Sequence, residues 1–133
     1  MRFFLLAMTA LLTISVIAAE TPPIVDAARH QDTVMLKQLL NAGSDPDTRQ
    51  ADGATALHWA VYHENIDAVA SLIEADSNVN AVNRLGASPL YLAAKNGNAN
   101  LIELLLEADA NPNIAMPMGE TPIMTAARSG TAQ

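Results

Sequence analysis

The sequence contains no cysteine in its 133 residues. Disulfide bonds, thiolate nucleophiles, cysteine–zinc sites and lipid attachment through an N-terminal cysteine are therefore excluded. Aromatic residues make up only 4% of the chain, so alanine, leucine and isoleucine must form most of any core. Small and aliphatic side chains of this kind suit helices that pack closely together.

Positive charge is also scarce. Seven Lys and Arg residues stand against 14 Asp and Glu residues, and the formal net charge is −7. Nucleic-acid binding requires clustered basic residues. Anionic membrane surfaces likewise attract basic segments. We therefore expect neither nucleic acid nor a membrane surface as a partner of this chain.

The longest uncharged run lies at the start of the chain. Met1 and Arg2 precede the stretch FFLLAMTALLTISVIAA, which ends at Ala19 and is followed by Glu20. A short positive start, an apolar centre and small residues at the end are typical of a secretory signal peptide. An uncleaved membrane anchor is the alternative, because about 17 residues is the lower limit for crossing a bilayer. We expect residues 1–19 to be a signal peptide and the protein to be periplasmic or secreted.

The rest of the chain repeats a single unit. Gly53, Gly86 and Gly119 are 33 residues apart, and the same interval recurs in apolar columns along each unit. These columns are Ala27, Ala60, Ala93 and Ala126; Leu57, Leu90 and Ile123; Leu36, Val69 and Ile102; and Leu39, Leu72 and Leu105. A fixed period of this length indicates a solenoid of stacked repeats.

Each unit predicts two short helices joined by turns, as residues 86–113 illustrate. Ser88 is the expected N-cap, with Pro89 in the first helical position. Gly97 is expected to end this helix in a left-handed conformation. A second helix is predicted from about 100 to 107, where apolar residues recur at helical spacing.

The motifs TALHWAV at 55–61, SPLYLAA at 88–94 and TPIMTAA at 121–127 resemble the opening of the ankyrin repeat. The period of 33 and the Asp or Asn that closes each unit also fit that family. The resemblance implies an all-α ankyrin-repeat solenoid of stacked helix–turn–helix units with projecting β-turn fingers. It places an ankyrin-repeat domain at residues 20–133, with repeats at about 22–49, 50–82, 83–115 and, in part, 116–133.

Two departures from a regular array follow from this alignment. The fourth repeat has a finger and a first helix but no second helix in this sequence. Either this half-repeat caps the stack, or the chain is a truncated product of a longer array. Glu64 takes the place of Gly97, and a non-glycine residue in the left-handed conformation costs about 1 kcal/mol or more. We therefore predict that the second repeat is weaker than the third.

The residues that carry most chemistry form no recognisable catalytic or metal site. His58 stands where the ankyrin family, by resemblance, uses a histidine to brace turn backbone. His30 and His63 share a column, but Asn96 and Ser129 continue it, so a third metal ligand is missing and we read both histidines as solvated. The serine and phosphate-loop motifs of enzymes do not occur. We predict a non-enzyme with no catalytic residue, metal site or cofactor.

Ankyrin stacks, by resemblance, bind partners on their concave side, through the finger tips and the exposed flank of each first helix. Four of the six basic residues after position 19 fall in this set, and its Leu, Met and Tyr residues suit an interface. Trp59 is expected to pack half-buried between repeats instead. The predicted partner-binding residues are Arg49, Asp52, Tyr62, His63, Arg84, Leu85, Lys95, Asn96, Pro117, Met118 and Arg128.

The sequence therefore favours a non-catalytic protein–protein interaction module, expected to be a monomer, with a protein as its partner. The cysteine-free chain and its short signal resemble the small periplasmic ankyrin-repeat proteins of Gram-negative bacteria. A secreted effector that acts on a host protein is one alternative. A fragment of a longer array, with its function in other repeats, is another.

Overall fold

The computed structural model describes residues 20–130, so the expected signal peptide at residues 1–19 lies outside the described range. Residues 20–130 form α-helices and no β-strand. No helix in this range is long and apolar enough to cross a membrane. The helices are α1 (Pro23–Arg29), α2 (Thr33–Asn41), α3 (Ala56–Tyr62), α4 (Ile66–Glu74), α5 (Pro89–Asn96), α6 (Ala99–Glu107) and α7 (Pro122–Ser129).

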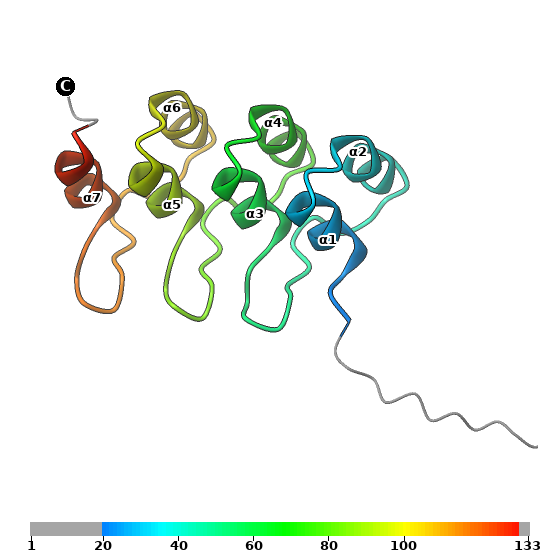
Figure 1. The fold of residues 1–133 in the computed structure, drawn as a ribbon, viewed down its shortest axis with the longest axis horizontal. Coiled ribbons are helices and arrows are strands. Elements are labelled where there is room, and N and C mark those ends of the chain that lie inside the picture. The colour runs from blue at the N-terminus through cyan, green and yellow to red at the C-terminus, as the bar shows by residue number, and fades with distance from the viewer. Residues whose placement is uncertain (1–19, 131–133) are drawn as a thin grey trace, which may run out of the picture.

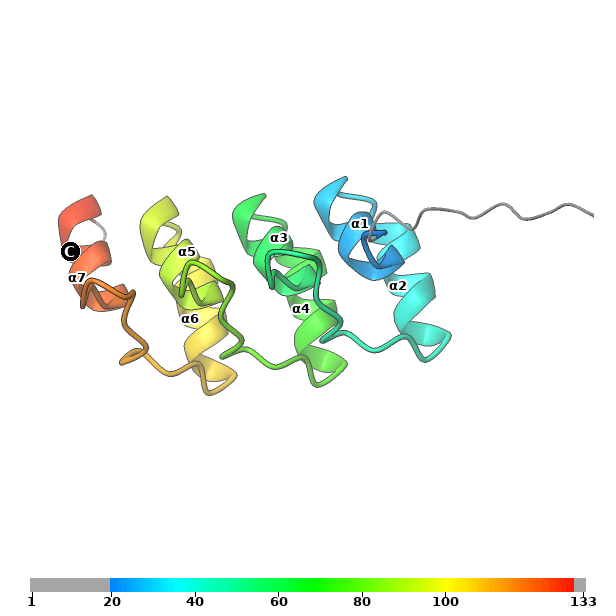
Figure 2. The ribbon, with the colours of Figure 1, turned by 90° about the horizontal axis from the view of Figure 1, so that it is seen from below.

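The helices stack in two layers (Figure 1). The first helices of the repeats, α1, α3, α5 and α7, lie side by side in one layer, and α2, α4 and α6 lie side by side in the other (Figures 1 and 2). The chain between repeats runs from the second layer past the first and projects beyond it as a finger. This arrangement confirms the all-α solenoid with projecting turns.

Each finger ends in a tight turn closed by backbone hydrogen bonds. In the first, the amide of Gly53 donates to the carbonyl of Gln50 (2.9 Å), and the amide of Gln50 donates to the carbonyl of Ala54 (2.9 Å). The other two turns repeat both bonds. The turns, here called finger 1, finger 2 and finger 3, comprise residues 50–54, 83–87 and 116–120.

Neighbouring fingers touch one another. The amide of Arg84 in finger 2 donates to the carbonyl of Asp52 in finger 1 (2.9 Å). Finger 3 approaches finger 2 so closely that a Cβ atom on Gly86 would lie 2.7 Å from Cδ of Pro117. Gly86 also has a φ of +85°, so both the backbone conformation and the close contact require glycine.

The helix ends follow the chemistry of the capping residues. The hydroxyl of Ser88 accepts a hydrogen bond from the amide of Tyr91 (3.1 Å), and Pro89 is the first residue of α5. Gly97 ends α5 with a φ of 73°. The Asn98 side chain then caps α6, which begins one residue before its predicted start. The predicted cap residues of this repeat are therefore confirmed.

The column that includes Gly97 adopts the left-handed conformation throughout. Glu64 has a φ of 55°, as predicted, and Gly130 has a φ of 81°. Gln31, at the same place in the first repeat, has a φ of 58°. The left-handed conformation of Gln31 was not predicted, although Gln31 stands 33 residues before Glu64.

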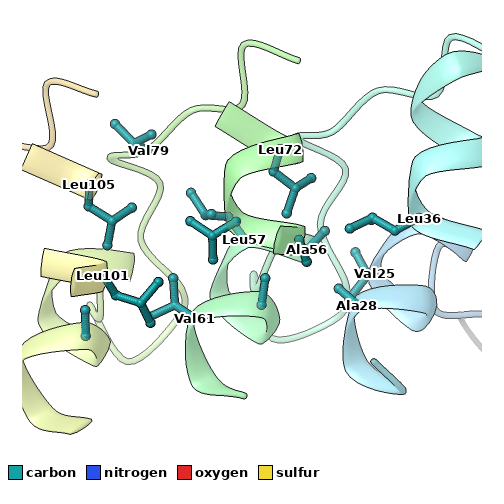
Figure 3. Packing of buried hydrophobic residues seen from close by; sticks show 14 of the residues in the cluster. Val25, Ala28, Leu36, Ala56, Leu57, Val61, Leu72, Val79, Leu101 and Leu105 are labelled. Atoms are coloured by element: carbon teal, nitrogen blue, oxygen red, sulfur yellow. The ribbon is translucent and has the colours of Figure 1, made fainter. Parts of the chain in front are cut away.

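A single apolar core runs along the interface between the two layers from α1 to α6. Leu57 of α3, Leu72 of α4 and Leu101 and Leu105 of α6 are completely buried (Figure 3). Each such side chain contributes about 1.5–3 kcal/mol through removal of apolar surface from water. Core residues come from adjacent repeats, so each repeat is stable only beside its neighbours.

Polar side chains join the loops that close successive repeats. The carboxylate of Asp47 accepts a hydrogen bond from the amide of Asn78 (2.7 Å). One repeat later, the Asn80 side chain accepts a hydrogen bond from the amide of Asn111 (2.7 Å). Asp47 and Asn80, which close the first two units in the sequence, therefore each bind the backbone of the following loop.

Candidate partner-binding surface

The apolar side chains predicted at the finger tips are directed to solvent. Leu85 in finger 2 is 72% exposed and Met118 in finger 3 is 97% exposed. Pro117, beside Met118, is also exposed. None of these three residues belongs to the apolar core. They form an apolar strip along finger 2 and finger 3 that is available to a partner.

Arg49, predicted to bind a partner, also supports the fingers themselves. Its Nη1 atom donates to the carbonyl of Gly53 (3.1 Å) and to the carbonyl of Val82 (2.8 Å). These bonds link finger 1 to Val82, the residue directly before finger 2. This structural role was not predicted, because Arg49 ends the first repeat whereas both carbonyls belong to the second.

Two of the predicted helix-flank residues bind the preceding repeat. Nε2 of His63 donates to the carbonyl of Arg29 (2.8 Å). The side-chain amide of Asn96 lies 3.4 Å from the carbonyls of both Val61 and Tyr62. His63 and Asn96 therefore hold the C-terminal end of the previous first helix, and a partner would meet groups that already have intramolecular bonds.

The two histidines of one column differ in environment. The prediction that both are solvated holds for His30, whose side chain is 63% exposed. It is wrong for His63, which is partly buried and stacks on Trp59 with a ring-centroid distance of 5.9 Å. The cause is the position of Trp59 on the same helix, one turn before His63.

Trp59, Tyr62 and His63 form an aromatic cluster on the exposed flank of α3. Trp59 meets Tyr62 edge-on at 5.6 Å, and Tyr62 meets His63 edge-on at 5.1 Å. The indole N–H of Trp59 donates to the side chain of Gln50 in finger 1 (3.0 Å). Trp59 is half-buried, as predicted, but it also contributes to the concave surface. The spacing of i, i+3 and i+4 on one helix was the available signal.

A hollow of about 250 Å³ lies beside this cluster, between α3, α5 and the bases of two fingers. This volume is slightly below the usual range for small-molecule sites, and it suits one or two side chains of a partner. Its lining residues are Asp52, Ala54, His58, Trp59, Tyr62, Asn83 and Leu92.

The two titratable groups of the hollow differ in charge. Hydrogen bonding from the Ala54 amide lowers the pKa of Asp52, so this carboxylate is ionised at neutral pH. Burial lowers the pKa of His58, which is therefore neutral. Nε2 of His58 donates to the carbonyl of Ala87 (2.9 Å), and Nδ1 accepts from the amide of Thr55 (3.1 Å). His58 thus braces finger 2 against α3, as the resemblance implied.

The remaining basic residues of the predicted set differ in how they are paired. Nη1 of Arg128 lies 2.6 Å from a carboxylate oxygen of Glu120. Arg84 and Lys95 are exposed, and neither takes part in an ion pair within residues 20–130. An acidic group of a partner can therefore reach these two charges without displacing another carboxylate.

No group of three or more His, Asp or Glu side chains is placed to hold a metal ion in the part of the chain that the structure describes. The hollow offers an ionised carboxylate and aromatic faces, whereas both nitrogens of the neutral His58 ring are engaged by Ala87 and Thr55.

A family model of ankyrin repeats, in three copies, matches residues 24–116 and 76–133. The chain belongs to the ankyrin-repeat family. Among curated proteins, no significant match to this ankyrin-repeat chain was found. Ankyrin repeats generally mediate protein–protein interaction and are typically non-catalytic.

Proposed function

We propose that this chain is a non-catalytic interaction module that binds a partner protein through its concave surface. That surface comprises finger 1, finger 2 and finger 3 with the exposed flanks of α3, α5 and α7. The exposure of Leu85 and Met118 at two finger tips carries the proposal, because neither side chain stabilises the core. Apolar, aromatic and arginine side chains are the groups that dominate interface energies.

The aromatic cluster supports the same surface. Tyr62 is 58% exposed and stands beside the hollow that Trp59 and Asp52 help to line. A side chain of the partner that enters this hollow would contact two aromatic faces and one carboxylate. The exposed charges of Arg84 and Lys95 would attract an acidic group at its rim.

We further propose that the protein is exported and acts as a monomer in the periplasm or outside the cell. The uncharged stretch from residue 3 to residue 19 supports export. Production of the full chain in a Gram-negative bacterium, followed by fractionation and intact-mass measurement, tests this proposal. Cleavage near Ala19 and recovery from the periplasm are expected. A full-length protein in the inner membrane would contradict it.

A pull-down from periplasmic extract tests the binding surface. The wild type is compared with a Leu85→Glu, Met118→Glu variant, which places two charges in the apolar strip. The matched control is Val34→Glu, Ile66→Glu, which adds the same charge to exposed positions of α2 and α4. Asp67 already occupies the register of Val34 one repeat later, so this position tolerates an acidic side chain.

A partner retained by the wild type and the control, but lost by the strip variant, is the expected result. Equal capture by all three proteins would move the binding site away from the concave side. Recovery of the protein from culture medium, with a host protein as the captured partner, would favour the secreted effector.

A further inference from the structure

The hollow between α3, α5 and the bases of finger 1 and finger 2 contains one carboxylate with an oxygen left over. Oδ1 of Asp52 accepts hydrogen bonds from the amide of Ala54 (2.9 Å) and from Nε2 of Gln50 (2.8 Å). Oδ2 receives no hydrogen bond from residues 20–130, and the carboxylate forms no ion pair with them. A charged oxygen at the hollow is therefore available to a donor that a partner supplies.

The carboxylate and the aromatic rings of the hollow are held together by one side chain. Oε1 of Gln50 accepts from Nε1 of Trp59 (3.0 Å), while Nε2 of Gln50 donates to Asp52. Trp59 in turn meets Tyr62 edge-on at 5.6 Å. A group that enters the hollow would thus meet a carboxylate and two rings that are already in place, which lowers the entropic cost of binding.

The basic residues nearest to Asp52 in the chain do not neutralise it. Nη1 of Arg49 is bonded to two backbone carbonyls. Arg84 donates its backbone amide to the carbonyl of Asp52, but its side chain forms no ion pair within residues 20–130. The imidazole of His58 is uncharged, because burial lowers its pKa. The charge of Asp52 therefore remains free to attract a cation.

Three columns of the repeat supply the carboxylate and the two rings, and all three columns change in the following repeats. The carboxylate is replaced by apolar side chains, the indole by smaller side chains and the phenol by cations. The columns are Asp52, Leu85 and Met118; Trp59, Leu92 and Thr125; and Tyr62, Lys95 and Arg128. A cation of a partner is thus attracted at the second repeat and repelled at the same place one repeat later.

We propose that this hollow receives an arginine side chain of the partner, a proposal that rests on the proposed function of the concave surface. The guanidinium donates to Oδ2 of Asp52 and lies against the rings of Trp59 and Tyr62. A guanidinium suits this place better than an ammonium group, because it is planar, more weakly hydrated and stacks on aromatic faces. The volume of about 250 Å³ accommodates one such side chain.

Lys95 adds an acidic residue to the expected partner segment. It stands in the register of Tyr62 one repeat later, is exposed, and has no ion pair within the part of the chain that the structure describes. Packed helices such as α3 and α5 lie about 8–10 Å apart, a distance that an extended chain spans in about three residues. The partner segment should therefore carry Arg and, three positions away, Asp or Glu.

The fluorescence of Trp59, the only tryptophan of the chain, reports directly on this hollow. Two peptides with capped ends, Arg-Ser-Gly-Glu and Glu-Gly-Ser-Arg in a Gly-Ser background, present the motif in both chain directions. Each is titrated into the wild-type protein beside a matched peptide in which citrulline, an uncharged isostere, replaces arginine. At least one arginine peptide should bind about tenfold more tightly than its citrulline control.

Protein variants test whether the arginine lies in the hollow. Asp52→Asn keeps an oxygen for the bonds from Ala54 and Gln50 but removes the charge, and should weaken binding of the arginine peptide about tenfold. Tyr62→Lys introduces the residue type found one repeat later and should abolish the preference for arginine over citrulline. Asp76→Asn removes a charge from an exposed turn outside the concave surface and should leave binding unchanged. Circular dichroism establishes that each variant is folded.

Charge reversal tests the position of the acidic residue. In Lys95→Glu, a peptide with lysine in place of glutamate should bind about threefold more tightly than the original peptide, because an exposed ion pair contributes only modestly. The wild type should show the opposite order. The same order in both proteins would contradict the three-residue spacing.

Failure of both arginine peptides to bind, or equal binding of the citrulline peptides, overturns the proposal. Binding that Asp52→Asn leaves unchanged also overturns it. The pull-down separates these results from the proposed function. Loss of the captured partner by Leu85→Glu, Met118→Glu, with no preference for arginine, would refute the arginine site alone. A preference for arginine, with equal capture of a partner by all three pull-down proteins, would contradict the proposed function and leave the arginine site standing.

Discussion

The first and last helices that the structure describes, α1 and α7, occupy the same place in their repeats but differ in what packs against them within residues 20–130. Ile24 of α1, a helix that packs against α2 and α3, is buried, and Ile123 of α7 faces solvent. The two residues are of the same type and stand in the same register. Burial in a solenoid is thus decided by the neighbouring helix rather than by the residue itself, and stability must be distributed unevenly along the chain.

The largest expected difference comes from shortening an apolar side chain at two positions of the same column. Leu90→Ala should lower the free energy of unfolding by about 2–5 kcal/mol, because it leaves a cavity beneath α6. Ile123→Ala, in the same register, should cost less than about 1 kcal/mol, since most of that side chain already contacts water. Urea denaturation followed by circular dichroism measures both values. Similar losses at the two positions would show that a further element covers α7.

The second test uses the next column, in which His58 corresponds to Met124. His58→Phe removes the hydrogen bonds to Ala87 and Thr55 and leaves buried groups without a partner, so we expect a loss of about 1–3 kcal/mol. Met124→Ala should have little effect, because Met124 is exposed. The same denaturation experiment compares them. A negligible loss at His58 would mean that finger 2 is held by other contacts.

The pH dependence of stability sharpens the role of His58. Burial lowers the pKa of His58 below its ordinary value of 6.5. As the pH falls, His58 is therefore protonated in the unfolded chain at a higher pH than in the folded chain. The stabilisation is therefore complete above pH 6.5 and is lost as the pH falls from 6.5 through the lowered pKa. Between about pH 5 and about pH 7, the free energy of unfolding should change less steeply with pH in His58→Phe than in the wild type. Equal slopes would exclude His58 as its source.

The smallest expected effect compares the non-glycine residues of the left-handed column, in the first and second repeats, with the glycine of the third. Gln31→Gly and Glu64→Gly should each stabilise the protein by about 0.5–1 kcal/mol, because glycine adopts a positive φ without steric cost. The gain at Glu64 should be the smaller, since its carboxylate accepts a hydrogen bond from Asn98 (2.8 Å). Thermal denaturation provides the measurement, with Gly97→Ala as a destabilising control. No gain at either position would remove the reason for expecting a weak second repeat.

The fold was largely predictable because the apolar residues of both helices and the residues that cap them recur every 33 residues. Ser88, Pro89 and Gly97 act through local backbone geometry, so their roles could be read from the sequence. The same holds for the left-handed conformation of Glu64. Such features depend on residues within one repeat, where the distance along the chain fixes the distance in space.

The candidate surface was less predictable, because it depends on contacts between repeats. Arg49 and His63 were read as available to a partner, yet they bind the carbonyls of Val82 and Arg29. Trp59 was read as a packing residue, yet it joins Tyr62 in the aromatic cluster. The direction of a long side chain is set by its rotamer and by the neighbouring repeat, and neither is encoded in the period.

The contacts between fingers have a kinetic consequence. The bond from Arg84 to Asp52 and the packing of Pro117 on Gly86 connect the three fingers into one continuous surface. Because the fingers already hold one another in position, binding requires no rearrangement of separate loops. The association rate of a partner should therefore depend little on which finger-tip residue is changed. Substitutions at Leu85 or Met118 should instead shorten the lifetime of the complex, and their effect should appear in the dissociation rate.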